Sequence, residues 1–292
     1  LGLVGESGCG KSVTALSIMR LVDDPPGKIV GGNIRLEATN LLDLPRREMR
    51  QIRGRDISMI FQEPMTSLNP VFTVGSQVSE VIQFHQKMER SEIWNKSIEM
   101  LRLVGIPSPE RRMSDYPHQL SGGMRQRIMI AMALACNPKV LIADEPTTAL
   151  DVTIQAQIME LMKKLQTEFH KSIILITHNM GLVAEMADEI CVMYMGRIVE
   201  YGRLRDIFEN PSHPYTKALL ASVPVPGMRD EDELVTIPGS TPDPAELGPG
   251  CEFADRCSQC MERCREKAVP AYAIAEGHWA RCLLFEHFKE VD

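Results

Sequence analysis

The sequence has no long apolar run and no excess of positive charge. Its longest unbroken apolar run, residues 128–136, is far shorter than the roughly 20 residues that a bilayer-spanning helix needs, and no signal peptide is visible. We therefore expect any association with a membrane to be made through a partner. The net charge of -7 argues against nucleic acid as the main partner.

The sequence also lacks an initiating methionine, internal repeats and coiled-coil heptads. It opens almost directly on an apolar run, so we expect a further segment to precede Leu1. The 292 residues are 44% hydrophobic and 24% charged, as in ordinary soluble globular proteins. This length suffices for one sizeable domain with an appendage, and the chain should bury a substantial core.

A glycine-rich stretch near the start fits the pattern G-x-x-x-x-G-K-S. It reads Gly5-Glu6-Ser7-Gly8-Cys9-Gly10-Lys11-Ser12 and lies between the apolar run and a helical pattern at residues 13–19. A strand that turns through glycines into a helix points backbone N–H groups and the positive end of the helix dipole at a nucleotide's phosphates. We expect Lys11 to reach the β- and γ-phosphates and Ser12 to bind Mg²⁺. The alternative is a Gly-rich turn that happens to precede a helix.

Strand and helix patterns alternate along the next part of the chain. Apolar runs predict buried strands at 57–61, 140–143 and 172–176, a short strand at 33–37, and a closing hairpin from 190–195 and 198–201. Helical spacing predicts helices at 44–53, 74–104, 123–135 and 152–168. The alternation predicts an α/β fold with a parallel sheet, a helical insertion around residues 74–104, and the chemistry at the carboxyl ends of the strands.

Polar residues follow three of these predicted strands. Asp144 and Glu145 end the strand at 140–143, and we expect Asp144 to hold Mg²⁺ and Glu145 to polarise the water that attacks the γ-phosphate. The alternative is a pair of acidic residues in the first turn of the next helix. We expect His178 to donate to the γ-phosphate, and Gln62 to touch Mg²⁺ or the water and so to sense the γ-phosphate.

A second anion-binding element follows the insertion. A serine and two glycines, Ser121-Gly122-Gly123, open the helix predicted from residue 123. Because a long segment separates this element from the phosphate loop, we expect the two half-sites to meet only across a dimer interface. ATP would then lie between two subunits.

Residues 1 to about 205 resemble the nucleotide-binding subunit of an ABC transporter, which implies a P-loop NTPase fold. The motifs that carry the resemblance are residues 5–12, Gln62, residues 120–124, Asp144-Glu145, Ala149-Leu150-Asp151 and His178. The resemblance implies that Ser121 and Gly123 contact the γ-phosphate of the partner's ATP and that Asp151 lies at the dimer interface. Met124 stands where many members have Gln, and the family's adenine-stacking aromatic residue is not assigned.

Residues 213–220, a Pro/Gly-rich linker at 224–250 and a cysteine-rich tail resemble the C-terminal extension of dipeptide, oligopeptide and nickel importer ATPases. The resemblance implies three parts: a nucleotide-binding domain at 1–205 with a helical subdomain at about 64–138, an extension and linker at 206–250, and a cysteine module at 251–292. It also implies an ATPase that powers import of di- or oligopeptides at the cytoplasmic face of a bacterial inner membrane.

The partners implied are a related but different second ABC ATPase subunit, two transmembrane permease subunits and, through the complex, an extracytoplasmic substrate-binding protein. Nickel import is the nearest alternative. A soluble ABC ATPase that acts on nucleic acid is disfavoured, because the span from Ser12 to Leu120 is short and the chain is acidic.

Five of the eight cysteines lie in the last 42 residues: Cys251, Cys257, Cys260, Cys264 and Cys282. Four Cys ligands suit tetrahedral zinc or a [4Fe–4S] cluster, and spacing alone does not separate the two. The resemblance implies an iron–sulfur site at Cys251, Cys257, Cys264 and Cys282, with Cys260 as a possible substitute. Zinc is the main alternative, and disulfides are the remaining one. A segment with so few large apolar residues is expected to need a metal to fold.

Overall fold

The computed structural model describes residues 1–62, 67–148, 150–223 and 236–291. It divides the chain into two compact units, one of Leu1–Lys11 with Leu175–Asp292 and one of Ser12–Ile174. Residues 63–66, Ala149, the first part of the predicted linker and Asp292 lie outside the described residues. In the part of the chain that is described, no helix is both long enough and apolar enough to cross a membrane.

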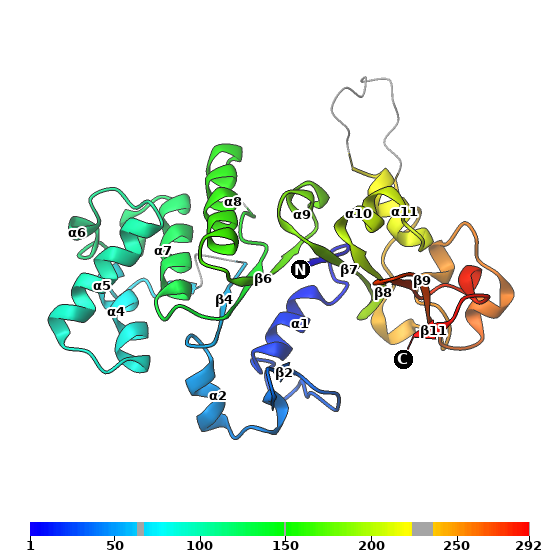
Figure 1. The fold of residues 1–292 in the computed structure, drawn as a ribbon, viewed down its shortest axis with the longest axis horizontal. Coiled ribbons are helices and arrows are strands. Elements are labelled where there is room, and N and C mark those ends of the chain that lie inside the picture. Colours follow the sequence, from blue (N-terminus) through cyan, green and yellow to red (C-terminus); the bar gives the residue numbers. More distant parts are fainter. Residues whose placement is uncertain (63–66, 149, 224–235, 292) are drawn as a thin grey trace. The chain divides into compact units, whose positions relative to one another are not determined.

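The first unit is built on a sheet of mixed direction (Figure 1). Strand β1 (Gly2–Val4) lies between β6 (Ser172–Thr177) and β7 (Glu189–Tyr194) and runs parallel to both. β7 turns into the antiparallel strand β8 (Arg197–Arg203), which confirms the predicted hairpin. The α-helices in the described part of this unit are α9 (Met180–Met186), α10 (Leu204–Glu209) and α11 (Pro214–Ala221).

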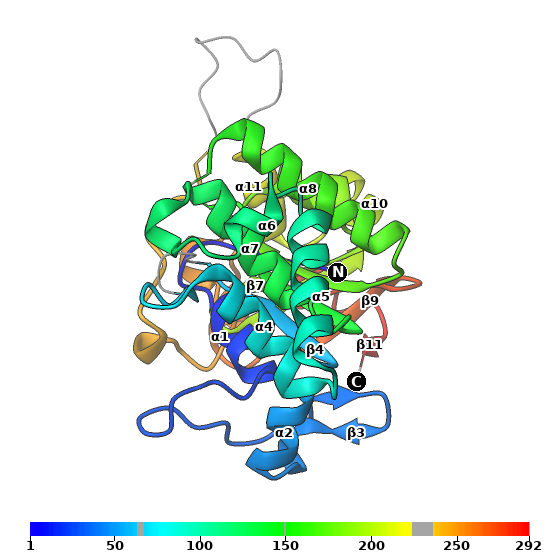
Figure 2. The ribbon, with the colours of Figure 1, turned by 90° about the vertical axis from the view of Figure 1, so that its left-hand side faces the viewer.

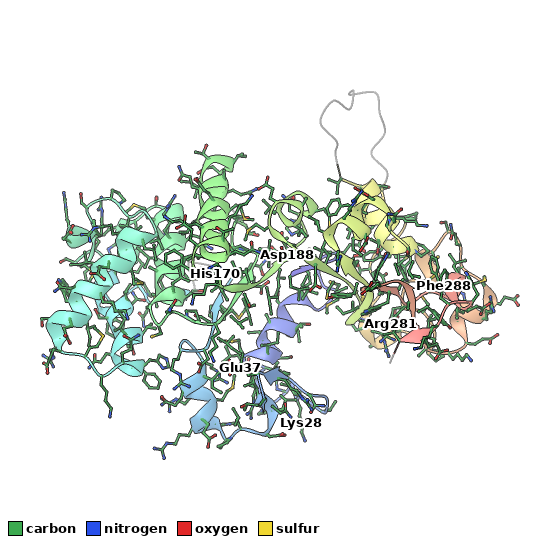
Figure 3. All side chains as sticks on the ribbon, in the orientation of Figure 1. Lys28, Glu37, His170, Asp188, Arg281 and Phe288 are labelled. Atoms are coloured by element: carbon green, nitrogen blue, oxygen red, sulfur yellow. The ribbon has the colours of Figure 1, made fainter. Side chains whose placement is uncertain are left out.

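The tail continues this sheet. Its strands are β9 (Ala271–Ala275), β10 (His278–Ala280) and β11 (Glu290–Val291). β10 pairs antiparallel with β8, so that Trp279 lies opposite Tyr201. Arg281, labelled in Figure 3, follows β10, and its backbone N–H donates to the Val199 carbonyl at 2.8 Å. The cysteine-rich segment is therefore tied to the sheet by strand pairing, which the sequence analysis did not predict.

The second unit combines a parallel strand pair with helices. Its elements are α1 (Lys11–Ile18, whose first residue belongs to the other unit), β2 (Arg35–Leu36), β3 (Thr39–Asn40), α2 (Arg46–Ile52), β4 (Ile57–Ile60), α4 (Val74–His85), α5 (Arg90–Leu103), α6 (Pro109–Arg112), α7 (Gly122–Leu134), β5 (Val140–Asp144) and α8 (Val152–Thr167). β4 and β5 pair in parallel, with Ile60 opposite Ala143. The predicted parallel pairing of these two strands is confirmed.

The segment predicted to be helical over residues 74–104 consists of two helices, α4 and α5. Glu89 accepts from the backbone of Glu92, and the Glu92 side chain accepts from the Glu89 N–H, so this reciprocal capping box starts a new helix. α4, α5 and α7 pack against one another (Figure 2), with Ile82, Ile93 and Ala135 in a shared core. All three helices lie within residues 64–138, the range predicted for a helical subdomain.

A buried carboxylate joins three elements of the first unit. Glu200 on β8 is fully buried and accepts from the backbone N–H groups of Ser212 at 2.7 Å and His213 at 2.9 Å. Its Oε1 also lies 2.8 Å from Nε2 of His278 on β10. Burial lowers the pKa of His213 to about 4, so the neutral ring can accept from the Tyr215 N–H and cap α11. Glu200 therefore connects β8 to the start of α11 and to β10.

Replacing this carboxylate should destabilise the first unit. Glu200→Ala leaves two buried N–H groups without an acceptor, and we expect the free energy of unfolding to fall by about 3 kcal/mol. Glu209→Ala is the matched control, because Glu209 pairs with Arg205 at the exposed surface and should change stability by less than about 0.5 kcal/mol. Urea titrations measure both, and an equal loss in the two variants would contradict this account of Glu200.

Candidate functional site

The phosphate loop begins where β1 ends. Because Val4 pairs with Thr177 on one side and Val192 on the other, the loop starts at the carboxyl edge of three parallel strands. A Cβ atom on Gly5 would lie 2.2 Å from the Met193 carbonyl oxygen, so only glycine fits there. The motif's first glycine is thus required by close contact with β7.

Backbone hydrogen bonds hold the loop's shape. The Cys9 N–H donates to the Glu6 carbonyl at 3.3 Å, and the Gly196 N–H of the β7–β8 turn donates to the Cys9 carbonyl at 2.7 Å. Gly8 and Gly10 have φ values of +82° and +104°, which favour glycine. Ser7 and Gly8 are exposed at the tip.

Lys11 starts α1 and points back across the loop. Its Nζ donates to the carbonyl oxygens of Gly5 at 2.8 Å and Glu6 at 2.9 Å. Cys9 is buried beside it, and burial raises the pKa of the Cys9 thiol. A buried, protonated thiol is a poor nucleophile, which agrees with Cys9 as a small loop residue and not a redox centre.

His178 lies at the same sheet edge as the loop. It directly follows Thr177, the last residue of β6, and its side chain is exposed. Because Thr177 is paired with Val4, Gly5 and His178 leave neighbouring strands at the same level. The fold therefore brings the predicted histidine to the edge where the phosphate loop starts.

In the second unit, Ser12 and Asp144 come together. Ser12 Oγ donates to Asp144 Oδ1 at 3.2 Å, although 132 residues separate them in the sequence. Asp144 ends β5 and is 3% exposed. A buried carboxylate beside a hydroxyl offers the oxygen ligands that Mg²⁺ prefers. The donor set therefore fits this ion.

Gln62 and Glu145 form a second polar pair. Gln62, just beyond β4, donates through Nε2 to Glu145 Oε2 at 3.0 Å, and Thr148 Oγ1 donates to the same oxygen at 2.8 Å. Glu145 has a φ of +45°, which is uncommon for a residue with a side chain and typical of functional turns. The turn orients the Glu145 carboxylate toward Gln62, two residues beyond the end of the neighbouring strand β4.

A buried glutamine that the sequence analysis did not single out supports this turn. Gln126 on α7 is 1% exposed, and its Nε2 donates to the Pro146 carbonyl at 2.5 Å. It thus links the helix that follows Ser121 to the turn that carries Glu145. The sequence could have pointed to Gln126, because it is a polar residue within an apolar helical segment. A polar residue on a buried face usually has a specific hydrogen-bond partner.

The predicted serine–glycine element forms the exposed start of α7. Ser121 accepts from the Met124 N–H at 3.3 Å and caps the helix, and Ser121 and Gly122 are exposed. Gly123 lies against Ile154 of α8, where an added Cβ would come within 2.9 Å of that side chain. Asp151 is exposed and caps α8 through the Ile154 N–H. The two helix starts therefore lie side by side.

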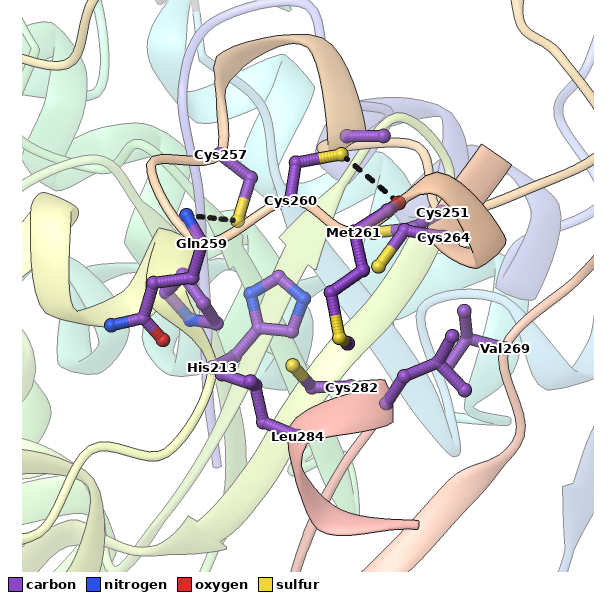
Figure 4. Close-up of a pocket in the computed structure, with 13 residues that line it drawn as sticks. His213, Cys251, Cys257, Gln259, Cys260, Met261, Cys264, Val269, Cys282 and Leu284 are labelled. Atoms are coloured by element: carbon purple, nitrogen blue, oxygen red, sulfur yellow. Dashed lines mark hydrogen bonds between the residues drawn. The ribbon is translucent and has the colours of Figure 1, made fainter. Parts of the chain in front are cut away.

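The five tail cysteines line one small cavity. It has a volume of about 20 Å³, and His213 and Met261 also border it (Figure 4). The Cys257 Sγ accepts from the Gln259 N–H at 3.4 Å, and the Cys260 S–H donates to the Met261 carbonyl at 3.5 Å. The fold thus gathers all five predicted thiols around one space.

These thiols do not form a metal site as they stand. Across the described ranges, no group of three or more His, Cys, Asp or Glu side chains converges in a way that could hold a metal ion. Burial raises the pKa of Cys251 to about 12 and that of Cys282 to about 11, so both hold their protons at neutral pH. A metal would have to displace these protons on binding.

Three known families match parts of the chain, one of them an AAA-domain family at residues 114–184. Residues 1–148 match the family described as ABC transporter, and residues 199–264 match the family described as oligopeptide/dipeptide transporter, C-terminal region. The first match spans the phosphate loop, Gln62, the serine–glycine element and Asp144-Glu145. The second begins in β8 and includes four of the five tail cysteines.

Several known proteins are similar over nearly the whole chain. A probable peptide ABC transporter ATP-binding protein of Sinorhizobium fredii is 54% identical over 97% of this chain and 84% of its own. The oligopeptide transport ATP-binding protein OppD of Bacillus subtilis is 51% identical over 97% and 79%, and the dipeptide transport protein DppD of the same organism is 52% identical over 99% and 86%. A dimeric ATP-binding cassette solved with ADP and Pi is 31% identical, with a TM-score of 0.62 over 70% of this chain and 84% of that chain.

Proposed function

This chain belongs to the ATP-binding subunits of ABC transporters, and we propose that it hydrolyses ATP to power the import of di- or oligopeptides. The P-loop ATPase fold expected from the sequence is confirmed by the likeness to solved cassettes. Peptide as the solute is supported by the match of residues 199–264 and by relatives named for oligopeptide and dipeptide transport.

The phosphate loop supplies the contacts for the triphosphate. The backbone N–H groups of residues 5–12 would surround the phosphates at the start of α1, and Lys11 would add a positive charge. In place of its bonds to the Gly5 and Glu6 carbonyls, the Lys11 ammonium would donate to phosphate oxygens. Ser12 and Asp144 would hold Mg²⁺, and Gln62 would add a further contact. Bound there, Mg²⁺ would neutralise phosphate charge.

Glu145 is the proposed general base. The observation that carries this proposal is the contact between Gln62 and Glu145, because it joins a residue at the end of β4 to a carboxylate at the end of β5. Such a carboxylate can accept a proton from the water that attacks the γ-phosphate. Gln62 reports on the presence of that phosphate, and His178 donates a hydrogen bond to it.

Replacing Glu145 by its amide should abolish turnover and spare nucleotide binding. We expect Glu145→Gln to lower kcat for ATP hydrolysis by about 100-fold or more, because the amide cannot take the proton. Phosphate release and equilibrium ATP binding are the two measurements. Glu160→Gln, the same change on an exposed position of α8, is the control and should retain the parent rate. Hydrolysis by Glu145→Gln at the parent rate would exclude Glu145 as the base.

The exposed start of α7 is the proposed contact to a second ATPase subunit. Ser121, Gly122 and Gly123 would meet the γ-phosphate held by the partner's loop, and Asp151 beside them would face the same partner. The second subunit is proposed to be a related but different chain. Closure of the pair on ATP and reopening after hydrolysis would drive alternating access in the membrane subunits.

The helical insertion is the proposed contact to the membrane subunits. Three apolar side chains on and just before α4 are unusually exposed: Val71 at 71%, Phe72 at 54% and Phe84, near the end of α4, at 48%. Burial of such side chains against a partner is favourable. The chain would thereby be held at the cytoplasmic face of the cell membrane, and a substrate-binding protein on the other side would deliver the solute.

Purification of the intact complex in mild detergent tests these partners. We expect this chain to copurify with a second ATPase and two polytopic membrane proteins, counted by native mass spectrometry. Vesicles containing the complex should take up labelled di- or oligopeptides in an ATP-dependent manner, with labelled nickel as the comparison. Copurification with nucleic acid and without membrane proteins would contradict the proposal.

We further propose that the cysteine tail holds an iron–sulfur cluster, with Cys251, Cys257, Cys264 and Cys282 as ligands and Cys260 as a possible substitute. The support is the donor set, since five thiols line one cavity. Four thiolates suit a [4Fe–4S] cluster and also tetrahedral zinc. The proposed role is structural, and no step of ATP hydrolysis passes through the cluster.

Metal content after anaerobic purification distinguishes the two metals. We expect iron and acid-labile sulfide in stoichiometric amounts and a brown colour. Cys257→Ser should lose most of the iron, while Cys191→Ser on β7, outside the cavity, should retain it. Cys260→Ser should also retain it if Cys260 is the spare thiol. If the protein is colourless and contains one zinc per chain, the bound metal is zinc and not an iron–sulfur cluster. A protein free of both metals would refute the proposal.

A further inference from the structure

An arginine of the cysteine tail holds the phosphate loop. Arg256 donates from Nη1 to Glu6 Oε2 at 2.7 Å and from Nη2 to Glu6 Oε1 at 3.0 Å, so the guanidinium and carboxylate face each other as a fork. The Arg256 side chain is 6% exposed and that of Glu6 is 25% exposed. Both residues belong to the same compact unit. A sheltered two-point pair is stronger and more directional than an exposed single contact.

Arg256 is itself fixed by its surroundings. Its Nε donates to the Pro238 carbonyl at 2.8 Å, and Nη1 also reaches the Tyr194 hydroxyl at 3.3 Å. The guanidinium lies about 6 Å from the ring centres of Tyr194 and Phe253, within reach of cation–π attraction. The hydrogen bonds to Glu6 raise the pKa of Arg256, which stays charged. These contacts hold the Arg256 guanidinium in one orientation toward Glu6.

The backbone of Glu6 has a second anchor. Its N–H donates to the Tyr215 hydroxyl at 2.8 Å, and Tyr215 on α11 is fully buried. The Tyr215 ring packs against Tyr194 at 4.7 Å and Phe253 at 5.2 Å between ring centres. The C-terminal extension thus holds Glu6 by its side chain and by its backbone, from two separate segments.

We propose that Arg256 and Tyr215 are positioning residues for the phosphate loop, which makes nucleotide affinity depend on the folded C-terminal extension. This inference rests on the proposed ATPase function. Two physical effects support it. Holding Glu6 also holds the carbonyl that accepts from Lys11, so the loop is ordered before the nucleotide binds. In addition, Arg256 neutralises a carboxylate that would otherwise repel the triphosphate.

The link also ties the loop to the cysteine cavity. Arg256 ends a short 3-10 turn (Ala254–Arg256), and the next residue, Cys257, lines the cavity. Coupling between two sites is reciprocal. If nucleotide binding stabilises this turn by some factor, a change in the cavity that moves the turn alters nucleotide affinity by the same factor.

The first test is the affinity of the full-length protein for MgATP. Arg256→Gln should raise Kd by about tenfold, a coupling of ordinary size between sites, while kcat at saturating ATP stays within about twofold. Arg265→Gln is the matched control, because Arg265 pairs with Asp255 on the same module with both side chains exposed, and it should leave Kd unchanged. An unchanged Kd in folded Arg256→Gln would overturn the proposal.

A second variant separates positioning from general damage. Adding Glu6→Gln to Arg256→Gln removes the unneutralised carboxylate, so the double variant should bind MgATP more tightly than Arg256→Gln alone. The defect of Arg256→Gln should also shrink at high salt, which screens the repulsion. Merely structural damage would be additive and insensitive to salt, and that result would refute the role in charge neutralisation.

Tyr215→Phe tests the backbone anchor and remains informative if Arg256→Gln fails to fold. It keeps the buried ring and removes the acceptor of the Glu6 N–H, and we expect Kd to rise about threefold.

Hydrogen exchange should show MgATP protecting the amides of residues 251–260 in the parent protein. Unchanged affinity together with no protection would overturn the inference. ATP binding by the parent in that experiment would leave the ATPase function standing, whereas a parent that binds no ATP would refute that function itself.

Discussion

The parallel pairing of β1 with β6 and β7 decides where the phosphate loop starts. It brings Gly5 against the Met193 carbonyl and sets His178 at the same edge of the sheet. In the second unit, the parallel pair β4–β5 does the same for Gln62 and Glu145. In each case the pairing of parallel strands determines where these functional residues lie. Short-range contacts between their side chains then fix their orientation.

Local patterns in the sequence were enough to predict the features that depend on neighbouring residues. The phosphate loop, the Ser121 cap and the strands before Asp144 and His178 all follow from spacing and turn chemistry. Residues 74–104 were correctly predicted to be helical, but the break between α4 and α5 was not located, because helical spacing continues on both sides of it and the capping box at Glu89 lies within a charged run. Element boundaries of this kind depend on a few polar contacts that periodicity does not record.

What the sequence could not predict are partners far apart in the chain. Glu200, Gln126 and Arg256 are single polar residues whose importance comes from burial beside a specific partner. The strands of the tail were missed for the same reason, since β10 is short and gains its pairing from β8. The rings of Tyr194, Tyr215 and Phe253 pack together and so connect the tail, α11 and β7. No local sequence pattern predicts these contacts.

The ion pair between Arg256 and Glu6 joins residues 250 positions apart in the sequence. During synthesis, Glu6 therefore leaves the ribosome long before its partner does. At typical rates of synthesis the phosphate loop leaves the ribosome roughly 12 to 50 s before its arginine does. During that interval the Glu6 carboxylate has no counter-charge from Arg256, and the Glu6 N–H lacks Tyr215 until α11 has emerged. The nascent chain therefore acquires these two contacts to its phosphate loop only after the C-terminal extension has been synthesised.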